Sequence, residues 1–225
     1  AGMLPSGSND PYALRRQTYG IVRIIEAKSW YFPLIKLQQA IGKKINSDEA
    51  RFGIQLASGQ KEVADFFKAR LRQRLHSEDT RHDVIDAVVN SEQEDVTKLF
   101  KAANILNRHL QDDNFKTSVE ALTRAINLAK KNEANSGHVD PNLFENESEQ
   151  ALFDAVADLE QKFPRQTMEE NYQGLMDLRP VIEAYFDATM VMVDDERIRR
   201  NRLNQLQIIA KMALAFASLD ELLTK

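Results

Sequence analysis

Apolar residues recur at intervals of three and four along most of the chain, the spacing that places them on one face of an α-helix. The pattern predicts a first helix that Asp10 caps, with Pro11 in its first helical position. A shorter helix over 34–41 follows, and Gly42 ends it. Residues 47–60 alternate apolar and polar positions beside two glycines, so a loop or a short helix is expected there.

Amphipathic patterns continue to the C-terminus and bring the total to about ten helices, with no dependable strand. The predicted ranges are 60–75, 84–89, 96–110, 119–131, 148–163, 168–178, 180–193 and 198–216. A polar, turn-rich stretch over 132–142 is the clearest loop. The sequence therefore predicts an all-α protein, a multi-helix bundle with two packed helical subdomains.

Composition supports this class and excludes several others. Only 8 Gly and 6 Pro occur in 225 residues, fewer than a sheet protein needs for its turns. The absence of Cys excludes disulfides, thiolate metal sites and a cysteine nucleophile. No apolar run reaches the ~18 residues of a membrane helix, and residues 1–9 do not resemble a secretory signal, so a cytoplasmic protein without a membrane is expected.

The net charge of −4 is unevenly distributed. Residues 1–113 carry 17 basic and 15 acidic side chains, whereas residues 114–225 carry 13 basic and 19 acidic ones. Such a chain is not a uniformly basic nucleic-acid binder. Any binding to a polyanion must come from local basic clusters.

Catalytic motifs are absent from the sequence, which has no glycine-rich phosphate loop and no G-x-S-x-G nucleophile turn. We therefore expect no catalytic residue in this chain. The pair His82-Asp83 could hold a metal ion, as in phosphohydrolases, but the nearest further ligands, His76 and Asp86, come from the same stretch. A surface pair at a helix start is the favoured interpretation, and no metal site is expected.

Two basic clusters remain. Four cations at every second position over 68–74 favour a solvated helix face over phosphate contact. The second cluster, over 197–202, lies on the last helix. Within it, an ion pair of Arg202 with a carboxylate such as Asp187 is as plausible as a contact with RNA. For the aromatic pair Tyr185 and Phe186, core packing is favoured over base stacking, at least for Phe186.

Several blocks of the sequence occur in the order of one known family. They are LPSGSNDPYALRR at 4–16, the stretch 67–89 with HDVIDAV, VDPNLF at 139–144, and 178–203 with LRP, YFD, MVMV and R-x-NRL. Together they resemble the C-terminal region of the β subunit of the bacterial heterotetrameric glycyl-tRNA synthetase. Residues 114–225 also resemble the DALR-type anticodon-binding domain shared with arginyl-tRNA synthetases, in Ala121-x-x-Arg124 and the final R-x-NRL block.

The resemblance implies that the α and β subunits have different roles. The β subunit binds tRNA(Gly) through its helical domain, and the α subunit of an α2β2 tetramer carries the site for ATP, Mg²⁺ and glycine. Residues 1–113 are then a helical linker derived from an HD-type domain, and 114–225 the DALR-type domain. The family's subunit is longer at its N-terminus, which implies that this chain is a fragment without a cofactor of its own.

The expected RNA contacts follow partly from the resemblance and partly from charge. Arg199 and Arg202 match the family's block, and charge adds Arg200, Asn201, Arg124, Lys130 and Lys131. Because the predicted anticodon-binding half is net acidic, we expect weak binding by the fragment that falls steeply with salt. The alternative is a helical scaffold for subunit or domain assembly, without direct RNA contact.

Overall fold

The computed structural model describes residues 5, 7–53, 60–132 and 138–223, and these form an all-α structure as predicted. The α-helices are α1 (Leu14–Lys28), α2 (Leu34–Phe52), α3 (Gln60–His76), α4 (His82–Val89), α5 (Val96–His109), α6 (Phe115–Ala129), α7 (Glu147–Lys162), α8 (Met168–Asp177), α9 (Arg179–Ala188) and α10 (Glu196–Phe216). Two short 3₁₀ turns, η1 (Pro141–Leu143) and η2 (Leu219–Glu221), complete the described part. An isolated bridge pairs Pro33 with Asp95.

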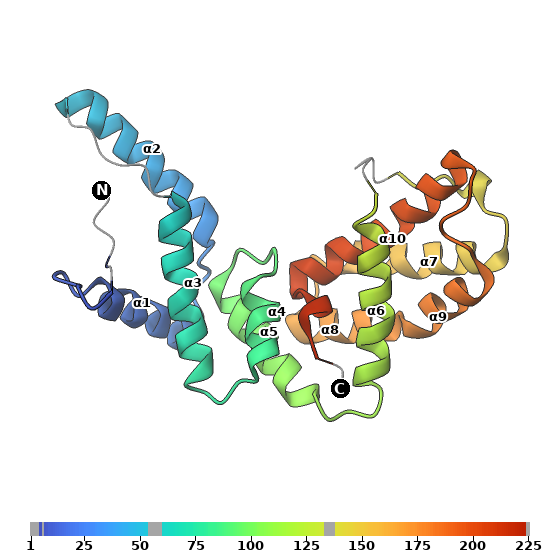
Figure 1. Ribbon diagram of the computed structural model, residues 1–225, viewed down its shortest axis with the longest axis horizontal. Helices are drawn as coiled ribbons and strands as arrows, with labels where there is room; N and C mark the ends of the chain where they lie inside the picture. The colour runs from blue at the N-terminus through green and yellow to red at the C-terminus, as the bar shows by residue number, and fades with distance from the viewer. Residues whose placement is uncertain (1–4, 6, 54–59, 133–137, 224–225) are drawn as a thin grey trace.

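The helices form an arm and a bundle (Figure 1). Helices α1, α2 and α3 make the arm, in which α2 packs along α3 and projects away from the rest. Helices α6 to α10 make the bundle at the other end, and α4 and α5 lie between the two. None of the helices in the described ranges is both long and apolar enough to cross a membrane.

The first two helices differ from their predicted bounds. Helix α1 begins at Leu14 and not at Pro11, because Ala13 adopts a left-handed conformation with φ of 51°. Asp10 still caps it, since its carboxylate accepts hydrogen bonds from the backbone N–H groups of Leu14, at 2.8 Å, and of Arg15, at 3.1 Å. A capping side chain was therefore identified correctly, while the position of the first turn was not.

Helix α2 runs to Phe52, so the prediction that Gly42 ends the helix is wrong. A glycine within a helix costs only about 1 kcal/mol relative to alanine, and the strong helix formers around it outweigh that cost. An ion pair between Lys44 and Asp48, one turn apart at 2.5 Å, adds support beyond the glycine. Residues 47–52 are thus helical, and residues 54–59 of the ambiguous stretch lie outside the described part.

Helix α9 also ends early, at Ala188 and not at Val193. Thr189 is extended, with φ of −127°, and its hydroxyl accepts a hydrogen bond from Asn146 Nδ2 at 3.1 Å. The following carbonyl, that of Met190, accepts a hydrogen bond from Arg202. Tertiary hydrogen bonds to side chains therefore replace the last predicted turn.

The bundle and the middle helices share one apolar core. Helices α6 and α10 pack along each other through Leu122, Ile126 and Leu206, none of which has exposed surface. The C-terminal segment ties α4 to this core, because Ser218 N–H donates to Ala87 O at 2.8 Å. The predicted domain boundary at 113/114 falls in the turn between α5 and α6.

Candidate functional site

Arg202 does not reach solvent. Its side chain is 3% exposed, and Nε donates to Oε1 of Glu149, itself 0% exposed, at 2.8 Å. Nη2 donates to Glu145 at 2.7 Å and Nη1 to the Met190 carbonyl at 3.0 Å. Burial alone would lower the pKa of Arg202, but the hydrogen bonds with the two glutamates outweigh it and raise this pKa. The structure favours an ion pair over an RNA contact, with carboxylates other than the expected Asp187.

Asn201 is buried as well and holds the η1 segment on α10. Its Oδ1 accepts the N–H of Asp140 at 2.7 Å, and its Nδ2 donates to the carbonyl of the same residue at 3.0 Å. One turn later, Asn204 Nδ2 donates to the carbonyl of His138 at 2.6 Å. The polar face of α10 therefore fixes backbone segments, a role that the sequence analysis missed.

Arg199 and Arg200 have different surroundings although they are neighbours in sequence. Arg199 Nη1 donates to the carbonyls of Val193, at 2.7 Å, and Asp194, at 3.2 Å, and so holds the loop before α10. Arg200 is exposed and pairs with Glu196 one turn earlier, at 2.7 Å. Of the predicted arginines on α10, Arg200 is the exposed one, and Glu196 partly neutralises its charge.

Exposed Arg200 and Arg197 border a groove between η1 and α10, which we call the η1–α10 groove. It has a volume of about 530 Å³. His138, Asp140, Leu143, Glu196, Asn201 and Asn204 also line it. Arg197 has no carboxylate within 4 Å among the described residues, so its guanidinium is available to a ligand. Because Asn201 and Asn204 fix the walls, the groove is preorganised.

The predicted contacts on α6 lie apart from that groove. Arg124 lies over the ring of half-buried Phe186, 4.0 Å from its centroid, a cation–π contact between α6 and α9. Lys130 pairs with Asp220 of η2 at 2.5 Å, and Lys131 is exposed. Tyr185 is fully buried in the core, whereas Phe186 is half-buried and packs against that core, so core packing is confirmed more fully for Tyr185 than for Phe186.

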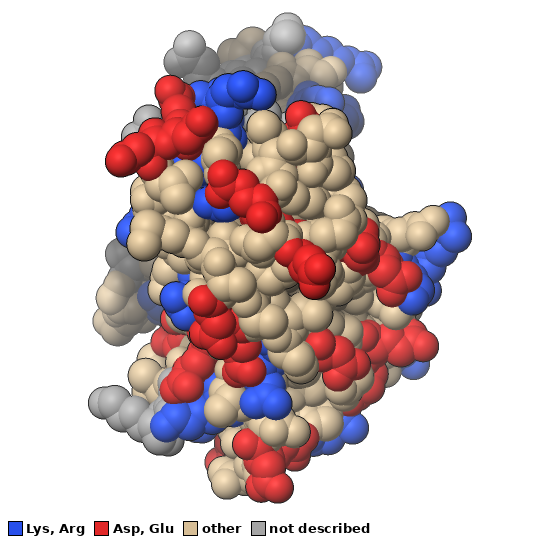
Figure 2. Space-filling view, turned by 90° about the vertical axis from the view of Figure 1, so that its right-hand side faces the viewer, with Lys and Arg blue, Asp and Glu red and all other residues tan. Residues whose placement is uncertain are grey.

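Figure 2 shows the end of the molecule where α7, α9 and the start of α10 lie. Basic and acidic side chains are interspersed on this face, and the residues described there form no continuous basic surface. Of the seven predicted contacts, Asn201 and Arg202 are buried, so the seven do not form one cationic face. A ligand would meet single guanidinium groups, such as those beside the η1–α10 groove.

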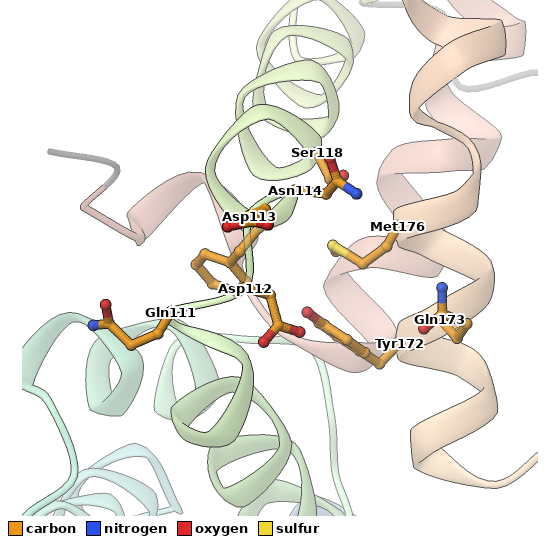
Figure 3. Close-up of a pocket in the computed structure, with 9 residues that line it drawn as sticks. Gln111, Asp112, Asp113, Asn114, Ser118, Tyr172, Gln173 and Met176 are labelled. Atoms are coloured by element: carbon orange, nitrogen blue, oxygen red, sulfur yellow. The ribbon is translucent and has the colours of Figure 1, made fainter.

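A second pocket lies between the α5–α6 turn and α8 (Figure 3). It measures about 520 Å³, and Asp112, Asp113, Asn114 and Tyr172 are among the residues that line it. His109 stacks on Tyr172, with ring centroids 4.6 Å apart, and hydrogen-bonds to Asp112 at 2.6 Å. Because its charges are acidic, this pocket disfavours phosphate.

The other sequence candidates are engaged within the chain. Asp83 accepts two hydrogen bonds from Arg81, both at 2.6 Å, and one from Leu223 N–H at 2.7 Å, which links α4 to the C-terminus. Burial would raise the pKa of Asp83, but these bonds outweigh it and lower that pKa. His82 Nδ1 lies 3.0 Å from a carboxylate oxygen of Asp86, and the described residues contain no cluster of three potential metal ligands.

Two of the four cations over 68–74 are paired with other helices. Arg72 pairs with Asp86 and donates to Asn90 at 2.8 Å, while Arg74 pairs with Glu26 of α1 at 2.7 Å. The hydrogen bond with Glu26 is the main reason why the pKa of Arg74 is raised. Arg72 and Arg74 connect α3 to α4 and α1, so this part of the expected solvated face is an inter-helix contact.

Comparisons with known proteins agree with this architecture. Residues 1–90 match the family model described as glycyl-tRNA synthetase beta subunit, and residues 118–219 match the DALR anticodon binding domain. The glycine–tRNA ligase beta subunit of Lactiplantibacillus plantarum is 42% identical over 227 residues, which cover 100% of this chain and 33% of that protein. The corresponding subunits of Levilactobacillus brevis and Listeria welshimeri are 45% and 40% identical, with 100% and 99% of this chain and 33% and 32% of those proteins covered.

This chain spans about a third of the length of the curated relatives that it matches. The two family matches follow one another along the chain and correspond to the arm with α4 and to the bundle. The chain therefore belongs to the glycyl-tRNA synthetase beta subunit family and carries a DALR anticodon-binding domain.

Proposed function

We propose that the chain is the tRNA-binding part of a glycyl-tRNA synthetase β subunit and that the η1–α10 groove receives the anticodon loop of tRNA(Gly). Arg197 and Arg200 would contact phosphates or base edges, because a guanidinium offers paired donors to either. Arg199, Asn201 and Arg202 hold the groove in place. The observation that supports this proposal most directly is the groove itself, which exposed Arg197 and Arg200 border within the region that matches the DALR model.

Two further cations are proposed as contacts to the RNA. Arg124 on α6 and Lys131, just beyond the end of α6, are exposed, and each could contact the RNA backbone. Lys130 is a weaker candidate, because Asp220 already neutralises it. With so few cations in a net acidic half, binding by this chain is expected to be weak and to fall steeply with salt.

The double variant Arg197→Gln/Arg200→Gln tests the groove. We expect its affinity for tRNA(Gly), measured by filter binding at low salt, to fall at least tenfold, since each good base or phosphate contact is worth about 1–3 kcal/mol. Lys162→Gln is the control, because Lys162 is exposed on α7 and does not line the groove. If the double variant binds tRNA(Gly) as tightly as the control does, the groove does not bind RNA.

The rest of the synthetase completes the proposed activity. We infer that ATP-dependent glycylation takes place in the α subunit, which holds ATP and Mg²⁺, and that this chain contributes RNA binding without a cofactor in a cytoplasmic α2β2 enzyme. An aminoacylation assay with purified α subunit and intact β subunit tests this. Loss of glycylation without either subunit is expected, and activity of this chain alone would contradict it.

An assembly role is the second candidate for the arm, because α1, α2 and their flanks expose large apolar side chains. These are Tyr12, Ile21, Ile24, Trp30, Tyr31, Ile35, Leu37, Ile41 and Phe52. Exposed apolar patches mark interaction sites. Since the chain spans a third of its relatives, we propose that the remainder of the β subunit covers this face.

Co-sedimentation with the separately expressed remainder of the β subunit tests the assembly role. The unmodified chain is expected to co-sediment, and Ile21→Asp/Ile24→Asp, on the exposed side of α1, is expected not to. Co-sedimentation that is unaffected by the two aspartates would exclude this face as the contact.

A further inference from the structure

Helix α5 presents a row of polar and cationic side chains opposite the start of α8. Lys98, Lys101, Asn104 and Arg108 are exposed at spacings of three, three and four, which places them on one helix face. The opposite face of α5 is buried in the core. With Thr167 and Glu169 this row lines a cavity of about 400 Å³, which we call the α5–α8 groove.

Positive charge in this groove is only partly neutralised. Glu169 is the acidic residue that lines it, and its carboxylate is shared between Arg108 and His109. Lys98 and Lys101 have no carboxylate within 4 Å among the described residues. Two ammonium groups one turn apart repel each other, so this arrangement does not stabilise α5 by itself.

A capping box occupies two of the backbone donors at the end of α8 that faces the groove. Thr167 Oγ1 accepts the N–H of Glu170 at 3.2 Å, and Glu170 accepts the N–H of Thr167 at 2.7 Å. The cationic side chains that this groove offers to an anion without a carboxylate partner among the described residues are those of Lys98 and Lys101. The same capping keeps the second wall of the groove in a fixed position.

The chemistry of the groove fits a phosphodiester backbone better than a base. Lysine ammonium groups are flexible point charges, which bind phosphate without reading sequence. The row from Lys98 to Arg108 extends about 15 Å at ~1.5 Å per residue, long enough to accompany more than one phosphate. The groove thus has the charge, length and open shape for a nucleic-acid strand.

We propose that the α5–α8 groove binds the sugar-phosphate backbone of the tRNA, through Lys98 and Lys101. This proposal rests on the proposed function, and it adds a second contact on helices other than those of the η1–α10 groove. The first groove would distinguish the anticodon loop, and the second would add affinity that is independent of sequence.

The test is the salt dependence of tRNA binding by the double variant Lys98→Gln/Lys101→Gln. Loss of two phosphate contacts is expected to reduce the slope of log K against log salt by about 1.5, which corresponds to about 30-fold at 0.1 M salt relative to 1 M. Affinities for tRNA(Gly) and for a copy with a substituted anticodon are expected to fall by the same factor. Circular dichroism melting checks that the variant folds.

Lys43→Gln/Lys211→Gln is the matched control, because both lysines are exposed, lack an ion pair among the described residues and line neither groove. If the slope of log K against log salt for Lys98→Gln/Lys101→Gln equals that of the control, the row on α5 is only a solvated helix face and the proposal is overturned. A loss confined to tRNA(Gly) would also overturn it, because it would indicate base reading.

The outcomes also separate this proposal from the proposed function. If the lysine variant behaves like the control while Arg197→Gln/Arg200→Gln weakens binding, the α5–α8 proposal fails and the proposed function stands. If the unmodified chain binds neither tRNA, both fail together.

Discussion

Arg202 and Glu149 form a buried ion pair that joins α10 to the first turn of α7, 53 residues apart in sequence, with Nε and Oε1 separated by 2.8 Å. Removal of one partner of such a pair leaves the other charge buried and unpaired. If Arg202 serves this ion pair, its substitution should lower the stability of the fold, whereas an RNA contact at Arg202 would affect tRNA binding and not stability.

Arg202→Met is expected to lower the free energy of unfolding by about 3–5 kcal/mol, because Glu149 loses its counter-charge. Urea unfolding followed by circular dichroism measures this. Arg202→Met/Glu149→Leu should recover much of the loss, since an apolar pair can replace a buried ion pair at similar stability. Unchanged stability of Arg202→Met together with weaker tRNA binding would instead identify Arg202 as an RNA contact.

Asn201→Ala is expected to loosen the η1 segment, because it removes both hydrogen bonds to the backbone of Asp140, each worth about 0.5–1.5 kcal/mol. Hydrogen–deuterium exchange of the Asp140 amide should become faster, and tRNA affinity should fall with it. Asn107→Ala, at an exposed position of α5, is the control. Equal exchange in the two variants would show that α10 does not hold the segment.

His109 predicts a pH dependence of stability. The hydrogen bond to Asp112 contributes most, ahead of that to Glu169, and raises the pKa of His109 above its ordinary value of about 6.5. The protonated ring is thus favoured in the folded state. Its stabilising effect is complete below pH of about 6.5 and is lost as pH rises through the raised pKa.

Glu169 makes the stability of the fold depend on pH in the acidic range. The hydrogen bond from His109 lowers the pKa of Glu169, so its contribution is present above the ordinary glutamate pKa and lost on acidification. For His109, urea unfolding from pH 5 to 9 should show a loss of stability as the pH rises above about 6.5, and His109→Gln should remove this loss. His82→Gln, at an exposed histidine, should retain the loss. Identical pH profiles for the two variants would refute this assignment.

The sequence was sufficient for the fold class and for most helix starts, because these depend on local signals. The local signal Thr167-x-x-Glu170 forms a capping box at the start of α8, and Asp195 caps α10. The end of α2 was missed, because a single glycine was given more weight than the helix formers beyond it. Local signals thus predict where helices begin better than how far they extend.

The candidate site was harder to predict, since the environment of an arginine depends on residues far away in sequence. The run 197–202 resembles one basic cluster, but helical periodicity distributes its side chains among solvent, a loop carbonyl and the core. Nothing local to Arg202 shows that Glu149 lies beside it. The sequence did contain a signal for this buried polar face. The amides Asn201, Asn204 and Gln205 are interspersed with the apolar residues Leu203 and Leu206, and all five are buried on α10.

The ratio of dissociation constants for tRNA(Gly) and for an otherwise identical tRNA with a substituted anticodon is the most direct measurement of anticodon recognition by this chain. The unmodified chain is expected to bind tRNA(Gly) at least tenfold more tightly, as about 1–3 kcal/mol per specific base contact implies, and Arg197→Gln/Arg200→Gln should bring the ratio towards one. Equal dissociation constants for the two tRNAs with the unmodified chain would contradict anticodon recognition.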